Sequence, residues 1–222
     1  MPVAEFLIGV AGSLAATALL MAVGWLLSSR ARRWVLAAFA RSAGLGVQRI
    51  HLHQKSASAD LAAEAARAGW VGVLAGRGNE LTRDTFLPLW SDAGWQPRPI
   101  RILLPDPEPG HDTWLVRRQE EVRAGDPGLR TGLLAEQVRI NARYLASAAR
   151  GKENCEIRFY DLPNHFRVVI TERTAFLTIY QSSVHGRKSP CIVARRPGQI
   201  YDFAQRIFSS AWESGRVPST TD

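Results

Sequence analysis

The chain has 222 residues and a formal net charge of +8 at pH 7. This length accommodates a membrane segment and one domain large enough to bury a core of its own. Two cysteines, Cys155 and Cys191, are too few for a disulfide framework and lack metal-ligand spacing, so we expect a reducing compartment. Nearly all of the positive charge is arginine, which suits anionic lipid, nucleic acid or a phosphorylated ligand, although a solvated surface accounts for it equally well.

An uncharged segment at 6–29 predicts a transmembrane helix, preceded by a short extracytoplasmic N-terminus at 1–5. As a helix the segment is roughly 36 Å long, enough to cross a hydrocarbon core of about 30 Å. Positive charges follow it, as Arg30, Arg32 and Arg33. The positive-inside rule therefore predicts a single-pass protein of the inner (plasma) membrane with a cytoplasmic C-terminal domain. A cleaved signal peptide is the alternative, because 16–18 has cleavage-site composition, but no basic residue precedes the apolar run.

Two features of the predicted anchor indicate what it contacts. Gly9 with Ser13, and Gly12 with Ala16, are spaced so that two helix backbones approach closely, which favours a homodimer. Small residues are also frequent in any alanine-rich span, which is the alternative interpretation. Residues 30–45 follow as a basic amphipathic juxtamembrane helix, whose arginines we expect to contact the phosphates of membrane lipids.

Beyond this helix, the apolar pattern predicts one α/β domain over 46–214 and a flexible tail at 215–222. Helices and strands alternate at first, with helices at 59–68 and 81–90 and strands at 71–75 and 100–104. Two further helices are expected at 112–123 and 129–149. Consecutive strands then follow, whose tight connections favour antiparallel pairing, at 156–160, 167–171, 175–180 and 191–194. The last helix has an apolar stripe formed by Phe203, Ile207, Phe208, Ala211 and Trp212.

One predicted strand contains an arrangement of residues that is typical of phosphoryl chemistry. His165 and Arg167 lie two positions apart, so they share a strand face, and Glu172 follows after the four β-branched residues at 168–171. A histidine, a cation and a carboxylate can supply a nucleophile or acid, a phosphate clamp and an orienting group. The same spacing also occurs at 53–60, in His53, Lys55 and Asp60, but the small residues between them lead into a helix. We interpret that second occurrence as a coincidence.

On these residues the chain resembles a single phospholipase D-type domain, whose signature is His-x-Lys-x4-Asp on a strand, followed by a second strand and a Gly-Ser-x-Asn turn. The resemblance extends over 46–212 and includes the segments 74–77, 101–107 and 158–163. It implies a mixed sheet flanked by helices, no metal or other cofactor, and a site completed by a second motif. A chain with one such motif would then act as a homodimer.

Carried over from the family, His165 would be the nucleophile or the acid, Arg167 the phosphate clamp and Glu172 the orienting carboxylate. The chain departs from the family pattern, because arginine replaces lysine and glutamate replaces aspartate. Where the family has Gly-Ser-x-Asn, this chain has Tyr180 and then the candidate ligand-binding residues Gln181, Ser182 and Ser183.

Two neighbouring segments are candidates for contact with a phosphate. A basic turn contains Arg187 and Lys188, although a solvated turn is the alternative, and the glycines at 74–79 are typical of a phosphate cradle. Together these features predict a membrane-anchored, metal-independent phosphodiesterase that uses a histidine nucleophile. The alternative is an inactive module that binds a phosphorylated ligand or partner in signalling or defence. In either case the ligand would be a nucleic acid, a nucleotide or a lipid headgroup.

Overall fold

The computed structural model describes residues 2–28, 31–32, 34–35, 38–39, 43–83, 85–90, 97–108, 113–125, 130–152, 154–180 and 188–218. The chain divides into two units, Met1–Ala43 and Gly44–Asp222, which are described separately. In the first unit, helix α1 extends over Pro2–Leu27. Its described large apolar side chains are exposed, and they are Leu14, Leu19, Leu20, Met21, Val23 and Trp25. Among the described residues, no helix is both long enough and apolar enough to cross a membrane. The predicted juxtamembrane helix lies only partly within the described residues.

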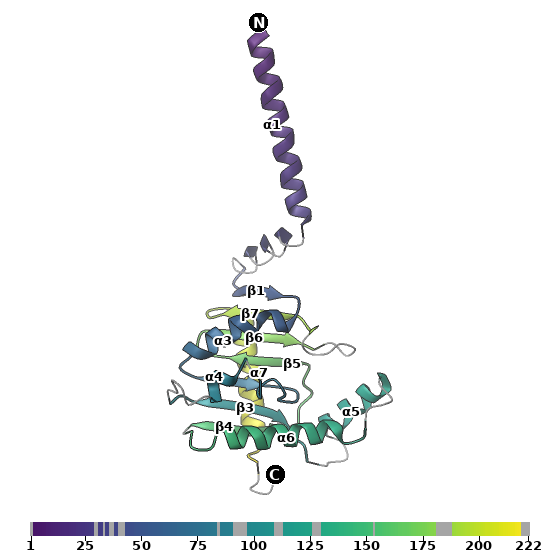
Figure 1. Ribbon diagram of the computed structural model, residues 1–222, viewed down its shortest axis with the longest axis vertical. Helices are drawn as coiled ribbons and strands as arrows, with labels where there is room; N and C mark the ends of the chain where they lie inside the picture. Colours follow the sequence, from purple (N-terminus) through teal and green to yellow (C-terminus); the bar gives the residue numbers. More distant parts are fainter. Residues whose placement is uncertain are drawn as a thin grey trace. The chain divides into compact units, whose positions relative to one another are not determined.

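The second unit is built on one sheet of seven strands in the order β1-β7-β6-β5-β2-β3-β4 (Figure 1). The strands extend over Val47–His51 (β1), Val71–Leu74 (β2), Ile100–Pro105 (β3), Cys155–Tyr160 (β4), Phe166–Ile170 (β5), Thr174–Ile179 (β6) and Cys191–Arg195 (β7). β2, β3 and β4 are parallel to one another, and every other neighbouring pair is antiparallel. The predicted α/β class with a mixed sheet is therefore confirmed.

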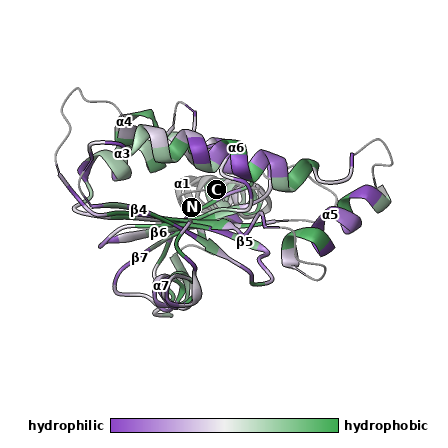
Figure 2. Ribbon diagram, turned by 90° about the horizontal axis from the view of Figure 1, so that it is seen from below, coloured by the Kyte–Doolittle hydropathy of each residue, from purple (hydrophilic) through white to green (hydrophobic). Residues whose placement is uncertain are grey.

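Helices cover both faces of this sheet (Figure 2). Figure 2 shows α3 (Ser58–Arg67), α4 (Leu87–Trp90) and α6 (Leu133–Ala148) on one side, and α7 (Gln199–Ser214) on the other. Because both faces are covered, β2 is buried at all four positions and shows no alternation of polar and apolar residues. Gly72 permits close packing of α7, because a Cβ atom there would lie 2.8 Å from the Phe208 ring.

Several boundaries and pairings differ from the sequence-based prediction. β4 pairs in parallel with β3, because α5 (Trp114–Gly125) and α6 form a long crossover between them. The short turn after β5 does give an antiparallel pair of β5 and β6, and β7 is also antiparallel to β6. The edge strand β1 was not predicted. The helix expected at 81–90 is reduced to α4, preceded by turns.

The polypeptide after α7 is held against the sheet by hydrogen bonds. Arg216 exchanges backbone hydrogen bonds of 2.8 Å with Phe159, and its guanidinium donates to Asp106 at 2.7 and 2.8 Å. The segment predicted as a flexible tail therefore contributes to the domain at least as far as Arg216.

Candidate functional site

The candidate site lies at one edge of the sheet, where several loops meet. The pairing Leu74↔Val168 brings the end of β2 beside the start of β5, and Phe166↔Ile179 brings the end of β6 to the same edge. The pairing His51↔Cys191 adds the end of β1 and the start of β7. Both motif-like segments of the sequence, 53–55 and 165–167, are consequently placed at this edge.

A cavity of about 810 Å³ opens at this edge, within the range of small-ligand sites. Among the described residues, five cationic side chains line it, Arg77, Arg83, Arg118, Arg167 and Lys188. Two carboxylates also line it, Glu80 and Glu121. This excess of positive charge in a recess favours an anionic ligand.

His165 is presented to the cavity by a network that fixes the backbone on both sides of it. The buried Asn164 donates from Nδ2 to the Tyr160 hydroxyl at 2.7 Å and accepts from Phe166 N at 2.9 Å. The Tyr160 hydroxyl donates to the Ala75 carbonyl oxygen at 3.1 Å, and Tyr180 N donates to the His165 carbonyl oxygen at 2.8 Å. Burial raises the pKa of Tyr160, so its hydroxyl keeps the proton that it donates. The exposed imidazole of His165 lines the cavity on this fixed backbone.

Arg167 lies on the same strand face but is only 4% exposed. Its guanidinium forms an ion pair with Glu80, whose carboxylate also accepts a hydrogen bond from the buried amide of Gln54. The guanidinium carbon lies 5.3 Å from the centroid of the Phe86 ring. Desolvation by burial lowers the pKa of Arg167. Electrostatic interactions with Tyr180 and Cys191 raise it, but by less, so the net pKa is lowered. The predicted phosphate clamp is therefore already occupied by a carboxylate of the same chain.

The loop after β2 forms one wall of the cavity. At Gly76 a Cβ atom would lie 3.4 Å from the Tyr180 ring, and Gly78 has a φ of +82°. Asn141 of α6 holds this loop, because its Nδ2 donates to the Arg77 carbonyl oxygen at 2.8 Å and also to Asn79 Oδ1. Turns follow this loop instead of a helix, so the helix N-terminus that typically completes a phosphate cradle is not formed there.

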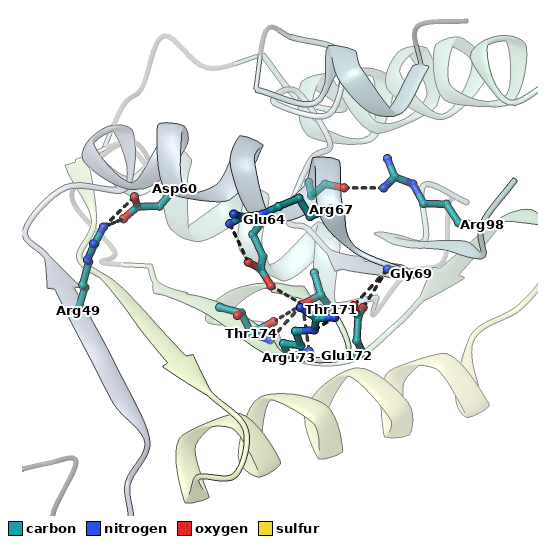
Figure 3. A network of polar contacts seen from close by, with 11 residues as sticks. Arg49, Asp60, Glu64, Arg67, Gly69, Arg98, Thr171, Glu172, Arg173 and Thr174 are labelled. Atoms are coloured by element: carbon teal, nitrogen blue, oxygen red, sulfur yellow. Dashed lines mark hydrogen bonds and ion pairs between the residues drawn. The ribbon is translucent and has the colours of Figure 1, made fainter. Parts of the chain in front are cut away.

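Glu172 is placed at the opposite end of β5 from His165. Its carboxylate oxygens accept hydrogen bonds from Gly69 N at 3.2 and 3.1 Å, which fixes the turn between α3 and β2 (Figure 3). Burial raises the pKa of Glu172, but backbone N–H groups of Glu172, Gly69 and Trp70 outweigh this, so the net pKa is lowered. The five residues of β5 separate Glu172 from His165, so the structure does not bring together the carboxylate and the histidine of the predicted motif.

In the second motif-like segment, the Asp60 carboxylate accepts hydrogen bonds from the Arg49 guanidinium at 2.7 and 2.8 Å, and His53 precedes the short helix η1 (Gln54–Ala57).

Of the predicted ligand-binding residues, Lys188 lines the cavity, whereas Gln181, Ser182, Ser183 and Arg187 lie outside the described residues. Within the described parts of the chain, no group of three His, Cys, Asp or Glu side chains is arranged to hold a metal ion. Gln54 and Glu80 were not predicted as site residues, because neither occupies a defining position of a recognisable sequence motif.

Comparisons with known proteins show distant likenesses only. No family model and no curated protein matches the sequence. Among solved structures, an archaeal chromatin protein with a novel mode of DNA binding is 12% identical, with 97% of this chain and 68% of that chain covered and a TM-score of 0.47. Nuc from Salmonella typhimurium, a phospholipase D family member, is 12% identical, with 77% of this chain and 98% of Nuc covered and a TM-score of 0.43. Phosphatidylserine synthase from Haemophilus influenzae is 12% identical, with 68% of this chain and 34% of the synthase covered and a TM-score of 0.47. The neighbours thus include the family that the motif resembles, at scores too low to assign this chain to it.

Proposed function

We propose that the domain is a phospholipase D-like module whose sheet-edge cavity binds a phosphorylated ligand. The observation that carries this proposal is the excess of cationic over anionic side chains among the described residues that line the cavity. Arginine binds phosphate through paired N–H donors and keeps its charge in a recess, so such a lining selects phosphate over a neutral ligand.

Binding is better supported than catalysis by the contacts of the motif residues. Arg167 is paired with Glu80, and Glu172 holds the turn at Gly69. A phosphate that reached Arg167 would therefore have to compete with a carboxylate already in place. We expect the remaining cations, Arg77, Arg83, Arg118 and Lys188, to make the first contacts with the ligand. Arg118 is paired with Glu121, but this carboxylate is 61% exposed, so the ligand displaces it at lower cost than Glu80.

The test is a thermal shift of the full-length protein with inorganic phosphate, adenosine 5′-monophosphate or glycerol 3-phosphate. A ligand at 100 times its Kd stabilises the folded state by about 2.7 kcal/mol, or roughly 5–11 °C in Tm for a chain of this size. Arg118→Gln should reduce the shift. Arg139→Gln is the matched control, because both arginines pair with a glutamate three residues away but Arg139 is absent from the cavity lining. No shift with any of the three ligands would refute the proposal.

Phosphodiester hydrolysis is the second candidate, and it is favoured by the position of His165 beside Arg167 at the cavity. In this candidate His165 attacks phosphorus and the leaving oxygen takes a proton from the His165 of a second copy, after which water cleaves the phosphohistidine. Hydrolysis of bis(p-nitrophenyl) phosphate by the full-length protein should fall at least about a hundredfold in His165→Ala and be unchanged in His53→Ala. Equal rates in wild type and His165→Ala would exclude this candidate, as would a strictly monomeric protein in sedimentation experiments.

Membrane anchoring through α1 is proposed as the setting of this function. The exposed apolar side chains along α1, such as Leu19 and Leu20, support it, because an apolar helix surface is stable only when another apolar medium covers it. The full chain should stay in the membrane pellet after carbonate extraction, and Leu19→Arg with Leu20→Arg should release it. Recovery of the wild-type chain in the soluble fraction would contradict anchoring.

A further inference from the structure

A second cavity, of about 560 Å³, lies beside the one that His165 lines. The two cavities share four lining residues, Gln54, Glu80, Arg83 and Arg167. Three of these form the partly buried contact described above, in which Glu80 accepts from both Gln54 and Arg167. This contact is therefore a partition between two adjoining cavities, and Arg83 and Arg167 are cations that border both of them.

The second cavity also favours an anion. Among the described residues, its lining has three cations, Lys55, Arg83 and Arg167, against the single carboxylate of Glu80. Lys55 belongs to the segment that repeats the spacing of the His165 motif. It lines the second cavity but not the larger one. Hydroxyl groups and apolar side chains complete the lining, including Ser58, Thr85, Thr178, Leu61 and Phe176. Such a mixture suits an uncharged carbon skeleton that ends in a charged group.

We infer that the two cavities form one bipartite site for a small molecule with two phosphate groups. One phosphate would lie in the larger cavity beside Arg118 and Lys188, and the other in the second cavity beside Lys55. The skeleton between them would pass Arg83 and Arg167 at the partition. This inference rests on the proposed binding of a phosphorylated ligand and adds a second subsite, so that Lys55 acts as a specificity-determining residue for the second phosphate.

The test compares fructose 6-phosphate with fructose 1,6-bisphosphate, which differ by one phosphate group, by isothermal titration of the full-length protein. We expect the bisphosphate to bind at least about tenfold more tightly, the gain from one added charge-assisted contact. Lys55→Gln should remove most of this gain and leave the affinity for the monophosphate unchanged. Lys152→Gln is the matched control, since this lysine lines neither cavity.

The outcomes separate this inference from the proposed function. If the monophosphate binds and Arg118→Gln weakens it, but the bisphosphate binds within twofold of it, the bipartite site is wrong and the proposed function stands. The bipartite site is also wrong if Lys55→Gln weakens both ligands equally. If neither sugar phosphate binds and none of the ligands used in the thermal shift binds, the proposed function and the bipartite site both fail.

Discussion

Removal of the Arg167 guanidinium tests whether the contact with Glu80 is the structural partition that we describe. In Arg167→Met an unbranched side chain remains that reaches about as far as Nε of arginine, but the charged guanidinium is lost, so Glu80 and Gln54 remain without this cation. Breaking a buried ion pair from one side costs about 3–5 kcal/mol. The Arg167 side chain is 5% exposed but that of Glu80 is 25% exposed, so water partly compensates the carboxylate and we expect the lower end, about 3 kcal/mol.

The assay is differential scanning calorimetry of the full-length protein. A loss of about 3 kcal/mol corresponds to a fall in Tm of roughly 6–12 °C for a chain of this size. The double variant Arg167→Met with Glu80→Gln should regain at least about 1.5 kcal/mol relative to Arg167→Met, because the group that faced the lost guanidinium is then also uncharged. A fall of less than about 2 °C in Arg167→Met, or strict additivity of the two single variants, would refute this account of the pair.

Two further predictions concern residues away from the cavity. Since the pKa of Glu172 in the folded state lies below its ordinary value of 4.5, its stabilising contribution is present above that value and is lost as the pH falls through the lower folded-state pKa. The Tm of Glu172→Gln should therefore fall less than the Tm of wild type between about pH 6 and pH 3. The affinity of this variant for phosphorylated ligands should be unchanged. Weaker binding would show that Glu172 belongs to the site. Gly72→Ala should destabilise the domain by about 1–3 kcal/mol, because its Cβ would lie 2.8 Å from Phe208 and 2.9 Å from Ile170. Gly69→Ala, whose nearest contact would be 3.9 Å, is its control, and equal melting of the two variants would contradict the packing of α7 on β2.

The local elements of the domain were predictable because their signals lie within short stretches of sequence. β5, β6 and β7 are short apolar segments, of which β5 and β6 are joined by a tight turn, and α7 has buried residues at helical spacing, among them Ala204, Phe208 and Ala211. The pairing of β4 was not predictable in this way. Its sequence signals a strand but not the strand with which it pairs, and only the crossover through α5 and α6 determines that it lies parallel to β3.

The candidate site was predictable only in part, for a related reason. His165 and Arg167 share a strand face by the period of a strand, so their neighbourhood follows from the sequence. The carboxylate that contacts Arg167 is Glu80, 87 residues earlier in the chain, and this pairing depends on the antiparallel packing of β5 against β2. Glu172 fits the spacing of the motif but is directed to Gly69, because the turn before β2 passes beside it.

Anomalous diffraction can locate an anion bound in the sheet-edge cavity and so decide whether this cavity binds phosphate groups. Crystals of the full-length protein would be grown with tungstate, an anion of the same shape and charge class as phosphate. We expect an anomalous peak inside the cavity, within hydrogen-bonding distance of at least two of Arg83, Arg118 and Lys188, which all line it. Tungstate bound only elsewhere on the protein, with the cavity free of anomalous density, would show that the cavity is not a phosphate site.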